Sequence, residues 1–212
     1  MDLSAAEIRV LGCLLEKQRT TPDQYPLTLN SLRLACNQAT NREPVVEYSE
    51  AFIREALHGL GRRGYIRFAG GHNTRAPKYR HLLADALPMS DAETAIMCVL
   101  MLRGAQTPGE LKQRGDRMHS FEGLAEVNEV LDALIDRGLA QRLDRRPGQK
   151  EERYAHLLDR DAEPATVATP AEDGAAHAEP DRSAGPQHLD LAERVGRLER
   201  EVAELRAAIV AP

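Results

Sequence analysis

The chain has 212 residues and is acidic overall, with 28 lysine and arginine residues against 33 aspartate and glutamate residues. Hydrophobic residues make up 42% of it, but aromatic residues only 4%, and tryptophan is absent. Cores built from leucine, valine, isoleucine and alanine favour small helical domains over β-sandwiches, whose strands draw on aromatic and β-branched residues.

The charge is spread unevenly along the chain. Residues 1–87 carry 12 basic and 9 acidic residues, residues 88–158 carry 10 and 12, and residues 159–212 carry 6 and 12. A dedicated nucleic-acid binder is usually basic throughout its binding domains. Only the first of these three segments is basic, and only mildly so.

Cysteine spacing and the N-terminus exclude several kinds of protein. Cys13, Cys36 and Cys98 are far apart and form no C-x-x-C pair, so the sequence predicts neither a zinc site nor a disulfide framework. The N-terminus has no basic stretch before an apolar one, and no long apolar run follows. We therefore expect a cytoplasmic protein without a signal peptide or a membrane span.

An internal repeat organises the first three quarters of the sequence. Segments of residues 1–87 match segments of residues 88–158 in the same order, which predicts two copies of one domain. The matching segments are Ser4–Glu7 with Ser90–Glu93, Thr21-Pro22 with Thr107-Pro108, Arg63-Gly64 with Arg137-Gly138, and Tyr79–Leu83 with Tyr154–Leu158.

Each copy is expected to contain three helices. The first begins at Ser4 or Ser90, where a glutamate three residues later completes a capping box. The second begins near Thr28 in the first copy and at Thr107 in the second, and the third presents an apolar face to the core. The residues expected to point inward from the third helix are Phe52, Ile53, Ala56, Leu57 and Leu60 in the first copy, and Leu124, Val127, Leu131 and Leu134 in the second.

A two-stranded hairpin is predicted after the third helix of each copy. Gly64 and Gly138 suit the left-handed position that ends a helix. The expected strands are residues 65–68 and 78–82 in the first copy, and 139–143 and 153–157 in the second. Three helices followed by a hairpin form a winged helix, a relative of the helix-turn-helix. The predicted fold class is therefore mainly α with small β-hairpins (α+β), as two tandem winged-helix domains.

Beyond residue 158 the composition changes. Residues 159–188 are rich in alanine, proline, aspartate and glutamate, which predicts a disordered linker. Residues 189–212 are predicted to form a coiled-coil helix that joins two chains as a parallel or antiparallel homodimer, or alternatively a single helix that packs on its own domains, since so short a coil is marginal alone. The heptad positions that would form the dimer are Leu191, Val195, Leu198, Val202, Leu205 and Ile209.

Several stretches resemble the YceH-like family of bacterial proteins, a domain-of-unknown-function family. The resemblance covers about residues 4–158 and implies tandem winged helices, but it implies no particular activity. The terminal coil also looks similar to the family, whereas the linker is longer and richer in alanine and proline. The stretches that carry the resemblance are Leu11–Gln18, Thr20–Pro26, Ala35–Gln38, Thr40–Val45 and Arg103–Leu111.

The third helix is the usual element that enters the DNA groove. In the first copy its outward residues are moderately basic, whereas in the second copy they are acidic and would repel phosphates. The acidic face is either a solvated surface or a docking patch for a basic partner. The outward residues are Arg54, Glu55, His58, Arg62 and Arg63 in the first copy, and Glu122, Glu126, Glu129, Asp132 and Asp136 in the second.

The polar loop of residues 37–43 is longer than a turn between two helices requires. Asn41 and Arg42 have side chains suited to base edges or phosphates, so they are candidates for DNA contacts. The alternative is a loop bonded to itself, in which Arg42 pairs with Glu43.

Both hairpin loops are basic, as expected of wings that contact the DNA backbone or minor groove. The alternative is a charged loop that contacts only water, which the neighbouring Glu151 and Glu152 favour. The basic residues are His72, Arg75, Lys78 and Arg80 in the first copy, and Arg145, Arg146 and Lys150 in the second.

No pattern of residues indicates catalysis, a cofactor or a metal. The sequence has no glycine-rich phosphate loop, nucleophile elbow or H-E-x-x-H motif, and His81 and His156 occupy equivalent strand ends that suggest packing. We therefore expect a non-enzymatic, DNA-binding, transcription-regulator-like protein. The alternative is a protein-interaction adaptor that docks its partner through the acidic second domain.

Overall fold

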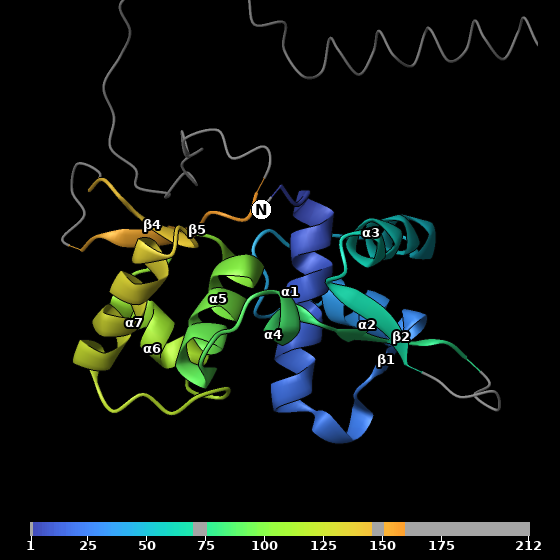
Figure 1. Cartoon of the computed structure of the whole chain (residues 1–212), viewed down its shortest axis with the longest axis horizontal. Coiled ribbons are helices and arrows are strands. Elements are labelled where there is room, and N and C mark those ends of the chain that lie inside the picture. Colours follow the sequence, from blue (N-terminus) through green and yellow to red (C-terminus); the bar gives the residue numbers. More distant parts are fainter. Residues whose placement is uncertain (1, 70–75, 146–150, 160–212) are drawn as a thin grey trace, which may run out of the picture. The chain divides into compact units, whose positions relative to one another are not determined.

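The computed structural model describes residues 2–69, 76–145 and 151–159 (Figure 1). The predicted coiled coil of residues 189–212 and all but the first residue of the predicted linker lie outside the described residues. The described residues are mainly helical, with small antiparallel sheets, as the sequence predicts.

The described residues of the first copy of the repeat, 2–69 and 76–87, form helices on either side of a short strand, followed by the two strands of a hairpin. Its elements are α1 (Ala5–Thr20), a 3-10 turn (Pro22–Gln24), β1 (Leu27–Thr28), α2 (Leu29–Cys36), α3 (Glu50–Arg62), β2 (Ile66–Ala69) and β3 (Lys78–His81). The three strands form an antiparallel sheet in the order β1-β3-β2, in which Tyr79 of β3 lies between Leu27 and Phe68. A short helix, α4 (Leu83–Ala86), leads into the second copy.

The second copy, residues 88–158, repeats this order of elements. They are α5 (Asp91–Arg103), α6 (Pro108–Gly115), α7 (Leu124–Asp136), β4 (Ala140–Leu143) and β5 (Arg153–His156). Strands β4 and β5 pair antiparallel, and a single antiparallel bridge between Gln106 and Tyr154 stands where β1 pairs with β3 in the first copy. The sequence repeat is thus matched by a repeat of structure.

Local signals in the sequence place the helix ends. Ser4, Ser90 and Thr107 each cap a helix, with a glutamate three residues on that bonds back to the capping residue. Gly64 and Gly138 follow α3 and α7 with φ values of 76° and 65°, in the region that costs other residues strain. The capping predictions are confirmed.

Two residues expected in the core lie outside it. Phe52 is 45% exposed and Leu124 is 51% exposed. Both stand in the first turn of their helix, before the buried stripes that begin at Ile53 in α3 and Val127 in α7. Phe52 packs instead on Tyr48, with 4.8 Å between ring centroids.

The two copies share one hydrophobic core because their first helices pack against each other (Figure 1). Every residue of α1 from Ala6 to Glu16 is buried, since α2 and α3 cover one side and α5 covers another. The two first helices are in close contact at Gly12, where an added Cβ would lie 2.9 Å from Cδ2 of Leu102. Both first helices are therefore buried nearly all round.

The histidines at the ends of β3 and β5 have the packing role expected of them. The Nδ1 atom of His81 accepts a hydrogen bond from the backbone of Leu83 at 3.3 Å, and that of His156 accepts one from Leu158 at 3.4 Å. Each bond requires an unprotonated nitrogen. Burial, with the nearby charges of Arg19 and Arg80, lowers the pKa of His81 to about 4.

This low pKa predicts a loss of stability in mild acid. Between pH 6.5 and pH 4 the unfolded chain binds a proton at His81 that the folded chain does not, so the free energy of unfolding falls as the pH falls, by about 2 kcal/mol from pH 7 to pH 5. His81→Asn keeps an acceptor without the titration and should show a smaller loss in urea unfolding at the two pH values. The same substitution at the exposed His58 is the control; equal losses for all three proteins would contradict the prediction.

Candidate nucleic-acid interface

The outer face of α3 carries three exposed basic side chains. Arg54, His58 and Arg62 follow one another at four-residue spacing, so they share one face of the helix. All three are exposed, and none of their side chains makes a hydrogen bond or ion pair with another residue that the structure describes. The opposite face of α3, from Ile53 to Leu60, holds the helix against the core.

A groove of about 450 Å³ runs between α3 and the sheet. Its floor is apolar, with Leu57, Ile66 and Tyr79, and Arg67 of β2 joins Arg54 and Arg62 at its rim. Phe68 is 69% exposed and lies against Tyr79, with ring centroids 5.0 Å apart. Sequence reasoning missed Arg67 and Phe68. Strand alternation from the buried Ile66 indicates that Arg67 points outward, but it places Phe68 on the same face as Ile66, so the exposure of Phe68 does not follow from the pattern.

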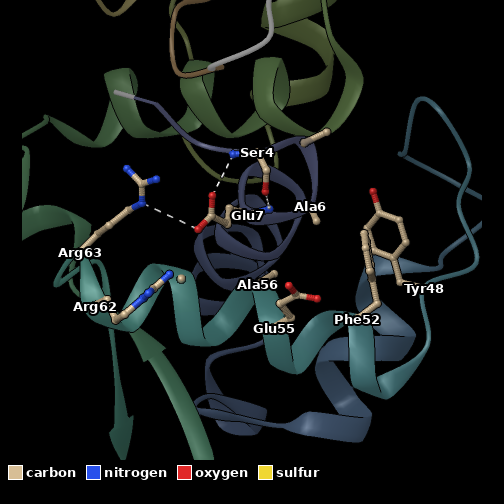
Figure 2. A pocket seen from close by; sticks show the side chains of 11 residues that line it. Ser4, Ala6, Glu7, Tyr48, Phe52, Glu55, Ala56, Arg62 and Arg63 are labelled. Atoms are coloured by element: carbon tan, nitrogen blue, oxygen red, sulfur yellow. Dashed lines mark hydrogen bonds and ion pairs between the residues drawn. The ribbon is translucent and has the colours of Figure 1, made fainter.

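A second pocket, of about 430 Å³, lies on the other side of α3, next to the start of α1 (Figure 2). Figure 2 shows Arg63 pointing toward α1, where its Nε atom lies 3.8 Å from Oε1 of the buried Glu7. The other carboxylate oxygen of Glu7 accepts a hydrogen bond from the backbone of Ser4 at 2.8 Å. Arg63 therefore pairs with α1, whereas its neighbour Arg62 is unpaired among the described residues.

The loop of residues 37–43 belongs to the first copy and forms hydrogen bonds with the second, and we call it the clasp. Arg42 is only 5% exposed, and it pairs with Glu16 of α1, with distances of 3.2 Å from Nη1 to Oε1 and 2.5 Å from Nη2 to Oε2. Its Nε atom donates to the carbonyl of Ala35 at 3.0 Å. Arg42 does not pair with Glu43, which was the alternative expected from the sequence. Because Arg42 is buried, its side chain cannot contact DNA.

The second copy closes the clasp. Arg117 also binds Glu16, the backbone N–H of Glu43 donates to the carbonyl of Leu102 at 2.9 Å, and Arg103 donates to Oδ1 of Asn41 at 2.7 Å. Burial alone would raise the pKa of Glu16, but the hydrogen bond and charge of Arg42, with the charge of Arg117, lower it. The clasp thus holds a buried, ionised network between the copies.

Comparison with known proteins places the chain in a family. The sequence model described as "Protein of unknown function, DUF480" matches residues 3–149. The chain belongs to the DUF480 family. The UPF0502 protein YceH of Salmonella paratyphi B, that of Salmonella typhimurium and that of Salmonella typhi are each 44% identical to it, over 97% of this chain and 93% of the relative. The resemblance noted from the sequence is confirmed.

The hairpin residues of this DUF480 chain are only partly described. Lys78 is half-buried on β3, and Arg145 is exposed with its Nε atom 3.6 Å from Glu152. Arg75, Arg146 and Lys150 lie outside the described residues, as do the six heptad positions of residues 189–212.

The corresponding helix of the second copy, α7, has four carboxylates and no lysine or arginine, whereas α3 has two arginines and two glutamates, with Arg54 and Arg62 on one face. Glu129, Asp132 and Asp136 are exposed on it, as expected from the sequence. The two third helices of this DUF480 chain therefore offer different surfaces to a partner, one basic and one acidic.

The residue types that usually bind metals do not gather in the part of the chain that the structure describes. No group of three or more histidine, cysteine, aspartate or glutamate side chains is close enough to hold a metal ion among those residues. Cys13, Cys36 and Cys98 are free thiols buried in the shared core. Within the same residues, no helix has the length and hydropathy to cross a membrane.

Proposed function

We propose that this protein binds double-stranded DNA without catalysing a reaction, and that each copy of the repeat is a winged-helix domain. The observation that carries the proposal is a set of basic side chains on α3 and β2 that have no ion-pair partner among the described residues: Arg54, His58, Arg62 and Arg67. Together they surround a face that no other described element covers. A surface of this kind attracts phosphates through charge and releases their counterions.

In the proposed complex α3 of the first copy enters the major groove. Arg54 and Arg62 have guanidinium groups that suit phosphates or the guanine edge. Arg67, which lines the groove, and the half-buried Lys78 lie on the hairpin strands β2 and β3, and winged helices contact the DNA backbone through this hairpin. The predicted coil of residues 189–212 would join two chains, so that two copies of α3 act on one site as a transcription regulator does.

Reversing the charge of α3 tests the proposal. Arg62→Glu and Arg54→Glu should each weaken binding to a mixed-sequence duplex roughly tenfold, measured by fluorescence anisotropy, because each places a carboxylate where a phosphate or base would lie. Neither changes the melting temperature, since neither arginine has a partner among the described residues. Arg142→Glu, on the exposed surface of β4, makes the same charge change and should bind as the wild type does. Unchanged binding by both α3 variants would refute the proposed surface.

A protein partner is the second candidate, favoured by α7. Its exposed Glu129, Asp132 and Asp136 share the helix with Leu124, which is 51% exposed. Acidic groups beside an exposed leucine suit a basic, partly apolar protein surface better than they suit DNA. Binding of such a partner, lost on Asp132→Lys and retained on Arg62→Glu, would support the adaptor function.

A further inference from the structure

Three arginines of the second copy gather where it meets the clasp. Arg103 ends α5, Arg114 lies on α6, and Arg117 follows α6. With Asn41 of the clasp and the apolar side chains of Leu102 and Met118, they line one small hollow of about 10 Å³, room for about one water. None of these residues belongs to the α3 face.

Cations outnumber carboxylates at this hollow. Glu16 is shared between Arg117 and Arg42, and Glu110 between Arg114 and Arg153, at 3.3 Å and 3.4 Å. Arg103 has no ion pair with a described residue; its hydrogen bond goes to the neutral amide of Asn41.

Two further observations show that Glu16 and Glu110 do not satisfy the cluster fully. The Nη1 atom of Arg114 is buried and has no hydrogen-bond partner among the described residues, which is costly for a charged donor. Burial and the charges of Arg114 and Arg117 lower the pKa of Arg103, and the charge of Glu43 offsets this only in part. An anion at the hollow would relieve both penalties.

We propose that Arg103, Arg114 and Arg117 form a binding site for a phosphate group at the seam between the two copies. Guanidinium groups are rigid forks that bind tetrahedral oxyanions through two bonds each. The hollow is too small for a whole phosphate, so one oxygen fills it and the group rests at its mouth on the three arginines. The phosphate belongs either to a small phosphorylated molecule or to a nucleic-acid backbone.

A phosphate bound at this site would strengthen the contact between the two copies. Arg103 donates a hydrogen bond to Asn41 of the clasp and also lines the phosphate site, and Arg117 binds Glu16 of α1. A ligand held by all three arginines therefore adds contacts between the second copy and the residues that meet the clasp. It binds the folded chain and not the unfolded one, so it should raise the melting temperature.

Thermal unfolding of the full chain in inorganic phosphate tests the site, with chloride lowered to keep the ionic strength constant. The melting temperature of the wild type should rise with saturation, by about 3 °C at ten times the dissociation constant. The double variant Arg103→Gln/Arg114→Gln should not respond. Arg142→Gln, an exposed arginine of the same copy with a single partner, should respond as the wild type does.

An equal rise in wild type and double variant, or no rise in the wild type, would overturn the proposal. If the double variant does not fold, the single variant Arg103→Gln replaces it, and broadening of the phosphorus NMR signal of inorganic phosphate replaces the melting temperature. Equal broadening by the wild type and Arg103→Gln, or no broadening by the wild type, would then overturn the proposal.

Duplex DNA distinguishes the two sources of the phosphate. If the double variant loses both the response to phosphate and affinity for DNA, the backbone supplies the group. If it loses the response and keeps DNA binding, a small phosphorylated molecule does. Failure of this proposal can be distinguished from failure of the proposed α3 interface, because Arg62→Glu should leave the response of the melting temperature to inorganic phosphate unchanged.

Discussion

Replacing Arg42 with methionine should destabilise the protein by about 3–5 kcal/mol, the usual cost of breaking a buried ion pair from one side. Among the described residues, the substitution leaves Glu16, which is 1% exposed, with only the partly exposed Arg117 and the more distant Lys17 as cationic partners. It also removes the donor that the carbonyl of Ala35 bonds to. Urea unfolding followed by circular dichroism measures the change.

Two further variants separate the ion pair from simple loss of packing. Glu16→Leu/Arg42→Met removes both buried charges and should recover much of the stability, because no unpaired carboxylate remains in the core. Arg33→Met, on the surface of α2, should change the free energy of unfolding by less than about 0.5 kcal/mol. A loss below about 1 kcal/mol for Arg42→Met would show that the clasp does not depend on this pair.

Gly12→Val should be the second most damaging change, with a loss of roughly 1–3 kcal/mol from overpacking. An added Cβ alone would lie 2.9 Å from Cδ2 of Leu102 and 3.2 Å from Cβ of Met101, and valine adds two methyl groups to it. The two helices must then move apart, which opens the core that both copies share.

Gly61 provides a matched control for this test. It lies in α3, and an added Cβ there meets nothing within 4 Å. Gly61→Ala should therefore stabilise the protein by about 0.5–1 kcal/mol, the gain in helix propensity over glycine. Equal stability of Gly12→Val and the wild type would mean that α1 and α5 do not pack as closely as described.

The parts of the fold that depend on local signals could be predicted from the sequence. Ser4, Ser90 and Thr107 begin helices because their side chains bond to backbone groups three residues away, and Gly64 and Gly138 end them because they adopt positive φ. The outward cations of α3 follow from helical spacing alone. Phe52 and Leu124 were misplaced because spacing cannot tell where along a helix the core ends.

The clasp could not be predicted, because its contacts join residues far apart in the sequence. Arg42 meets Glu16 across 26 residues, and Arg117 meets Glu16 across 101. A polar loop with an arginine has the same composition whether it faces DNA or a buried carboxylate. One usable signal was missed: between Ala6 and Leu15 apolar residues occupy nearly every face of α1, which indicates a helix covered on more than one side.

The most direct test of the central claim is the salt dependence of DNA binding by the wild-type chain. Fluorescence anisotropy with a mixed-sequence duplex at about 50 mM and about 200 mM salt measures it, because each phosphate neutralised by an arginine or lysine releases counterions. If α3 and its hairpin bind DNA, the dissociation constant is micromolar or tighter at the lower salt and rises steeply at the higher. No binding at the lower salt would contradict the claim and leave the acidic surface of α7 as the place to look for a partner.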